Sequence, residues 1–87
     1  MLQLEGAKLK EQGVTFAVVI VKPHVVANPN EAQDAIRRFF PLFGGVPIVL
    51  MAQDSYGTPT YFGRKDIARF MASVPVSSVP WKRYTFN

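Results

Sequence analysis

Two nearly continuous apolar runs, Val14 to Val21 and Val46 to Met51, stand out along this chain. Both are rich in β-branched residues and lack polar alternation, a pattern typical of strands that are buried on both faces of a sheet. Pro23 ends the first run because proline has no N–H to offer a neighbouring strand. A third, shorter strand is predicted over residues 58–62, where Pro59 indicates a position at the edge of the sheet.

Apolar residues at helical spacing follow Asn28 and predict a helix between the two apolar runs. Asn28 can act as its N-cap, with Pro29 at the first helical position and Glu31 placed to close a capping box. Pro41 ends or kinks this helix, because its ring clashes with the preceding turn. Gly44-Gly45 then completes the exit of the chain from the helix.

The remaining segments complete the predicted domain. A second helix is expected from Arg64 to Ser73, and residues 2–12 are predicted as a short amphipathic N-terminal helix. The chain from residue 75 is predicted as a loop, followed over residues 81–86 by an edge strand or a docked tail. Together the elements predict one α/β domain with a mixed three- or four-stranded sheet packed against two or three helices. The residues at the centres of the strongest patterns are expected to share one core: Val18, Ile20, Ile36, Val49 and Phe70.

The order of elements between residues 14 and 74 resembles the C-terminal half of thioredoxin-like folds. The resemblance rests on a strand, a helix, Gly45-Val46-Pro47 before a buried strand, a hairpin through Gly57 and a closing helix after Phe62-Gly63. It implies that a cis peptide bond precedes Pro47 and that the two buried strands run antiparallel. The Cys-x-x-Cys segment of that family is absent, so the resemblance implies no thiol redox activity.

The amino-acid composition excludes several classes of protein and of binding site. The 87 residues are 48% hydrophobic and only 18% charged, which excludes a disordered chain. The absence of cysteine excludes disulfides, thiolate zinc sites and iron–sulfur clusters, and a single histidine provides no set of metal ligands, so no cofactor is expected. No apolar run is long enough to span a membrane, and no signal peptide is evident, so the expected compartment is the cytoplasm.

Charge is distributed unevenly along the chain. The net charge is +4, and residues 1–59 contain five basic and five acidic residues, so the whole excess lies in residues 60–87. Aromatic residues alternate with these basic residues, and such segments can hold a phosphate backbone and stack on bases. The other interpretation, which the sequence favours, is a solvated helix face beside core aromatics. The candidate nucleic-acid contacts are Arg64, Lys65, Arg69, Trp81, Lys82, Arg83 and Tyr84.

Phe39 and Phe40 are the candidate protein interface. Adjacent helical residues point about 100° apart, so one ring can face the core while the other faces solvent or a partner. The alternative is that both are buried. Because an exposed apolar patch on a small domain marks an interface, the first expectation is a non-catalytic interaction module that binds a protein partner or forms a homodimer. Nucleic-acid binding through the basic C-terminal segment is the alternative function.

A catalytic role is the third hypothesis, and it depends on His24. This histidine follows the first buried strand, where open α/β sheets place their sites, and it could act as a general base. Asp54 would lie at a neighbouring strand end only if the two strands run parallel. An ordinary loop histidine is the favoured interpretation, so no catalytic residue is assigned.

Overall fold

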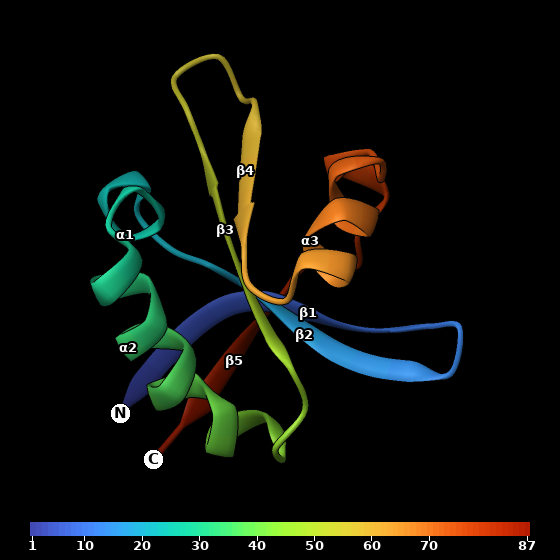
Figure 1. The fold of residues 1–87 in the computed structure, drawn as a ribbon. Coiled ribbons are helices and arrows are strands. Elements are labelled where there is room, and N and C mark those ends of the chain that lie inside the picture. The colour runs from blue at the N-terminus through green and yellow to red at the C-terminus, as the bar shows by residue number, and fades with distance from the viewer.

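In the computed structural model, which describes residues 1–87, a mixed five-stranded sheet has the strand order β4-β3-β2-β1-β5 (Figure 1). Strands β2 and β3 pair in parallel, and every other pair is antiparallel. The strands are β1 (Leu2–Glu11), β2 (Val14–Ile20), β3 (Ile48–Gln53), β4 (Pro59–Phe62) and β5 (Lys82–Phe86). The helices are α1 (Pro23–Ala27), α2 (Pro29–Phe39) and α3 (Lys65–Ala72), with short 3-10 turns η1 (Phe40–Phe43) and η2 (Val76–Ser78). The α/β class is as predicted, but the sheet has five strands rather than three or four.

The prediction of an N-terminal helix is wrong, because residues 2–11 form strand β1. This strand pairs with β2 through a two-residue turn in which Gln12 and Gly13 have φ values of 49° and 80°. Positive φ at both central residues suits the twist of a tight hairpin. The alternation is hard to recognise because the buried side of β1 changes midway, from the side of Leu4 to the side of Ala7 and Leu9.

Helix α2 begins with the predicted Asn28 cap but without the predicted capping box. The Asn28 side chain accepts hydrogen bonds from the backbone N–H groups of Asn30 and Glu31, at 3.1 and 3.2 Å. The capping box does not close: the Glu31 carboxylate lies 3.3 Å from His24 Nε2, and the Asn28 N–H donates to the Val25 carbonyl. The helix gives way to η1 at Phe40, and both Gly44 and Gly45 have positive φ at the exit.

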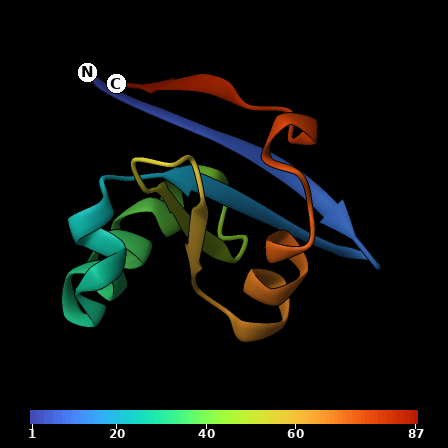
Figure 2. The ribbon, with the colours of Figure 1, turned by 90° about the horizontal axis from the view of Figure 1, so that it is seen from above.

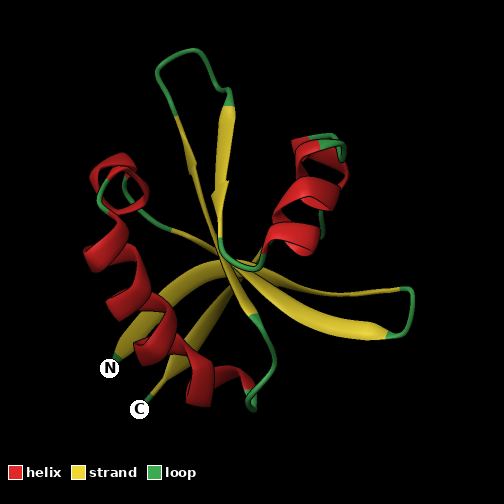
Figure 3. Cartoon of the chain, in the orientation of Figure 1, coloured by secondary structure: helices red, strands yellow, loops and turns green.

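The sheet separates two hydrophobic clusters, so the prediction of one shared core is wrong. We call the side of Ala7, Phe16 and Val18 the α3 face, because Ile67 and Met71 of α3 pack on it. The opposite side, with Ala17, Val19 and Leu50, is the α2 face, and it packs against α2 and η1. Figure 3 shows the helices on either side of the strands. Of the five predicted core residues, Val18, Ile20, Val49 and Phe70 belong to the α3 face, whereas Ile36 belongs to the α2 face.

Both edges of the sheet come from the second half of the chain. Strand β4 forms one edge, as Pro59 predicted. The predicted edge strand at residues 81–86 is present as β5, which pairs antiparallel with β1 and lies along its outer side (Figure 2). The two chain ends therefore lie together, with Leu2 opposite Phe86.

Two details implied by the thioredoxin-like resemblance are not found. Strands β2 and β3 run parallel rather than antiparallel, because the α1–α2 crossover returns the chain to the same end of the sheet. The chain contains no cis peptide bond, so the bond before Pro47 is trans. The hairpin through Gly57 and the closing helix α3 do follow in the implied order.

Candidate nucleic-acid interface

The structure disperses the basic residues that the sequence places together. Arg64 and Lys65 lie at the start of α3 and Arg69 lies farther along that helix. Trp81 directly precedes β5 and packs with the α3-face cluster, whereas Tyr84 within β5 packs with the α2-face cluster. The seven predicted contacts therefore occupy two faces of the sheet and one helix, and they do not form one surface.

Two of the three predicted arginines already bind carboxylates. Arg64 donates from Nε and Nη2 to the two carboxylate oxygens of Asp66, at 2.8 and 2.9 Å. The hydrogen bond from Arg64 lowers the pKa of Asp66, and the same hydrogen bond raises the pKa of Arg64. Arg83 Nη2 lies 3.8 Å from Glu5 Oε1 on the adjacent strand. These guanidinium groups are partly neutralised where they stand.

The two predicted stacking residues have structural contacts of their own. Trp81 is half-buried, and its Nε1 donates a 2.9 Å hydrogen bond to the Val76 carbonyl. The Tyr84 ring meets Phe43 edge-on with ring centroids 5.1 Å apart and stacks on Phe86 at 6.4 Å. Lys82 Nζ lies 4.9 Å from the centroid of the Tyr84 ring, a cation–π contact.

A different basic surface arises where β1 and β5 pair. Side chains alternate along a strand, so Lys8 and Lys10 of β1 lie on the same side as Gly6, and Gly6 pairs with Lys82 of β5. We call Lys8, Lys10 and Lys82 the lysine row; it lies on the α2 face. All three side chains are exposed, and no lysine of the chain belongs to an ion pair.

The acidic residues of β1 lie on the other side of the same strand. Glu5 and Glu11 occupy odd positions, so they share the α3 face with Ala7 and Leu9. The turn end of the β1–β2 hairpin also points away from α2 (Figure 1), which leaves its α2 face uncovered. Because its side chains alternate between the two faces, β1 has zero net charge but one basic and one acidic face.

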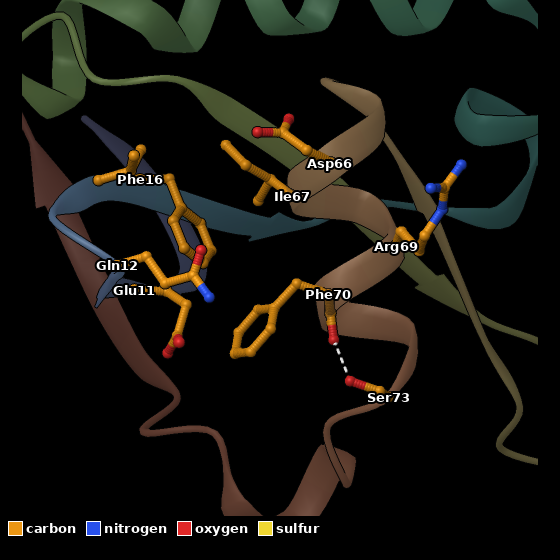
Figure 4. A pocket seen from close by; sticks show the side chains of 9 residues that line it. Glu11, Gln12, Phe16, Asp66, Ile67, Arg69, Phe70 and Ser73 are labelled. Atoms are coloured by element: carbon orange, nitrogen blue, oxygen red, sulfur yellow. Dashed lines mark hydrogen bonds between the residues drawn. The ribbon is translucent and has the colours of Figure 1, made fainter.

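A groove of about 500 Å³ lies on the α3 face, between the hairpin turn and α3. Figure 4 shows Glu11 and Phe70 pointing into this space, whereas Arg69 points away from it. Asp66 is held by Arg64, and the Ser73 hydroxyl donates to the Phe70 carbonyl at 2.6 Å. Glu11 is therefore the one carboxylate of the groove without a bonded partner, and no hydrogen bond links polar side chains across it.

His24 and Asp54 follow strands that end at the same side of the sheet, because β2 and β3 run parallel. This parallel arrangement was the condition for placing the two side chains at neighbouring strand ends. Each nevertheless has a local contact. Asp54 Oδ1 accepts from the backbone N–H groups of Tyr56 and Thr58, at 2.8 and 2.9 Å, and so holds the β3–β4 turn. His24 and its partner Glu31 are both exposed, and no cluster of His, Asp or Glu could hold a metal ion.

The adjacent phenylalanines point in different directions, as one of the two interpretations predicted. Phe39 is 7% exposed and belongs to the α2-face cluster, whereas Phe40 is 45% exposed. The exposed part of this pair is a single ring rather than a patch. An interface role for Phe40 stays a prediction.

Sequence reasoning missed Lys8 and Lys10. Their charges cancel against Glu5 and Glu11 in any sum along the chain, and the predicted helix hid the alternation. The spacing of these residues could have revealed the two faces. Glu5 and Glu11 are at odd positions and Lys8 and Lys10 at even positions, which places them on opposite faces of a strand.

Comparison with known proteins finds no family model, no curated protein and no solved structure that matches the chain. None of its helices has the length and apolar character needed to cross a membrane.

Proposed function

We propose that this protein is a non-catalytic binding module that holds the phosphate backbone of single-stranded nucleic acid on the lysine row. The observation that carries the proposal is the grouping of three exposed lysines on one uncovered face, with the nearest carboxylates of β1 on the opposite face. A lysine without an ionic partner binds a phosphate more favourably than a paired arginine, because the arginine must first break its contact with a carboxylate.

The spacing of the row supports one phosphodiester chain as the ligand. Lys8 and Lys10 are two residues apart on an extended strand, which places their backbones about 7 Å apart. That is the scale of the distance between successive phosphates in an extended single strand. Lysine acts as a point charge on a flexible stem and tolerates varied phosphate geometry.

The aromatic contacts favour binding through the backbone rather than through bases. Tyr84 contacts Phe43, Phe86 and Lys82, and Trp81 is hydrogen-bonded to Val76, so both rings are already held in contacts within the protein. Contacts to phosphates carry no sequence information of their own. The affinity should therefore depend strongly on salt and weakly on sequence, with a dissociation constant of about 10⁻⁴ to 10⁻⁶ M.

Fluorescence anisotropy of labelled oligonucleotides at several salt concentrations tests this. Three phosphate contacts to a single strand predict a slope of log affinity against log salt of about −2. The variant Lys8→Gln/Lys10→Gln/Lys82→Gln should lose this slope and bind at least tenfold more weakly. The matched control, Lys22→Gln/Lys65→Gln/Arg69→Gln, removes the same charge away from the row and should bind like the wild type.

Two results would overturn the proposal. Equal losses in the two triple variants would show that net charge, rather than the lysine row, attracts the oligonucleotide. Equally tight, equally salt-dependent binding of polyglutamate or of anionic vesicles would show that the row recognises any polyanion. Circular dichroism and thermal melting of both variants establish that they remain folded.

A further inference from the structure

The outer edge of β5 carries backbone groups without partners, because β5 pairs only with β1. We propose that this edge pairs antiparallel with β5 of a second copy of the chain, which joins two five-stranded sheets into one. The pairing stands on the geometry of the edge and does not depend on nucleic-acid binding.

The two edges of the sheet differ in how well they resist such pairing. Strand β4 has four residues and includes Pro59, which has no N–H, so it is a poor template for a further strand. Strand β5 contains no proline, and its Tyr84-Thr85-Phe86 segment consists of residues that favour strands. Phe43 packs against both aromatic rings of β5 and holds the strand in place.

Strand length and charge together favour one register of the pair, because a two-fold axis at Tyr84, the middle residue of β5, pairs all five residues of the strand. A two-fold axis at Tyr84 places Arg83 opposite Thr85 of the second copy and Lys82 opposite Phe86 of the second copy, so no like charges oppose each other directly. A shift of the axis by one residue to Arg83 sets two arginines opposite each other, which is unfavourable. The axis at Tyr84 also repeats the contact of Lys82 with an aromatic ring, now across the interface.

This arrangement extends the basic surface. Lys82 lies on β5 and Lys8 and Lys10 lie on the adjacent strand, all on the α2 face. Pairing at β5 brings two lysine rows onto one continuous face and doubles the number of cations that one nucleic-acid strand can reach.

Cysteine crosslinking tests the register, since the chain has no cysteine of its own. Arg83 and Thr85 are exposed, so Arg83→Cys and Thr85→Cys leave both clusters intact. In the proposed register the two new side chains oppose each other only when the variants are mixed. Identical side chains lie diagonally, about 7–8 Å apart, which is too far for a disulfide.

We expect the oxidised equimolar mixture to form at least tenfold more disulfide dimer than either variant alone. Thr60→Cys on β4 is the matched control and should not crosslink with either variant. Sedimentation of the wild type should show a mass rising from 9.7 kDa toward twice that value with concentration. A mass fixed at 9.7 kDa, or equal crosslinking of the mixture and of Arg83→Cys alone, would overturn the pairing. The variant Lys8→Gln/Lys10→Gln changes the lysine row on β1 and leaves β5 intact, so it should crosslink like the parent, and failure of either proposal is distinguishable from failure of the other.

Discussion

The two faces of the sheet are built alike, but the charged residues of β1 differ in sign between them. Each is filled at its centre by one hydrophobic cluster and covered by helix, α3 on one side and α2 with η1 on the other. On the α3 face the exposed part of β1 carries Glu5 and Glu11; on the α2 face it carries Lys8 and Lys10. Strand β1 therefore contributes to two hydrophobic clusters and places its acidic and basic residues on opposite faces.

The change of buried side occurs at Gly6 and Ala7, where β1 crosses between the two clusters. Both residues are buried, and a Cβ at Gly6 would lie 2.4 Å from the Val18 carbonyl oxygen. The close approach of β1 to β2 at this point leaves no room for a side chain. Four predictions test the contrast between the faces, in order of expected effect.

The largest effect is expected for Met71→Ala on the α3 face. Met71 is fully buried in its cluster, whereas Ile36 on the α2 face is half-buried. Urea unfolding should show a loss of about 3–4 kcal/mol for Met71→Ala and about 1 kcal/mol for Ile36→Ala, because truncation costs scale with the cavity left behind. A larger loss of unfolding free energy for Ile36→Ala would show that the α2-face cluster, rather than the α3-face cluster, is the more tightly packed.

Gly6→Ala should cost about 3 kcal/mol, because the new Cβ meets backbone that cannot move aside without separating β1 from β2. Gly13→Ala is the control at the other end of the same hairpin. It meets no atom within 4 Å and adds only the cost of its positive φ, about 1 kcal/mol. Equal losses for the two variants in urea would show that β1 does not depend on close contact at Gly6.

Trp81→Ala should lower the free energy of unfolding by about 2 kcal/mol, since the half-buried ring packs on the α3 face and its Nε1 is hydrogen-bonded. The slope of oligonucleotide affinity against salt should stay unchanged, because this side chain lies on the opposite face from the lysine row. A loss of oligonucleotide binding with unchanged stability would contradict this division of roles.

The smallest effect is expected for Tyr61→Phe, also on the α3 face. The Tyr61 hydroxyl is buried without a hydrogen-bond partner, and burial raises the pKa of this side chain. Removing the hydroxyl should leave stability at pH 7 equal or raise it by up to about 1 kcal/mol.

The same change should alter the response to alkali. Unfolded tyrosine ionises near pH 10, whereas the folded side chain holds its proton to higher pH, so the unfolded state loses protons first. Wild-type stability should therefore fall above about pH 10, and Tyr61→Phe should reduce that fall. Urea midpoints measured at pH 7 and pH 11 check both expectations; parallel falls in the two proteins would remove Tyr61 as a contributor.

Short-range chemistry in the sequence determined much of the fold. The apolar runs of β2 and β3, the Asn28-Pro29 helix start, the Gly44-Gly45 exit and the edge position of Pro59 were all predicted correctly. Each depends on a residue type acting within a few positions of itself: a proline without an N–H, a glycine with positive φ, or an amide that caps a helix.

Only the tertiary structure decided the features that depend on distant partners. Strand β1 exists because β2 and β5 pair with it, and its alternation was obscured by the change of buried side at Gly6. The placement of Ile36 on one face and Phe70 on the other follows from the parallel crossover, which no local pattern encodes. The lysine row brings Lys8 and Lys10 together with Lys82, while Asp66 and Glu5 bind two of the three arginines of the predicted contacts. The net charge of a segment follows from its sequence alone. The charge of a surface also depends on which face each side chain lies on and on which strands are neighbours, and the folded sheet determines both.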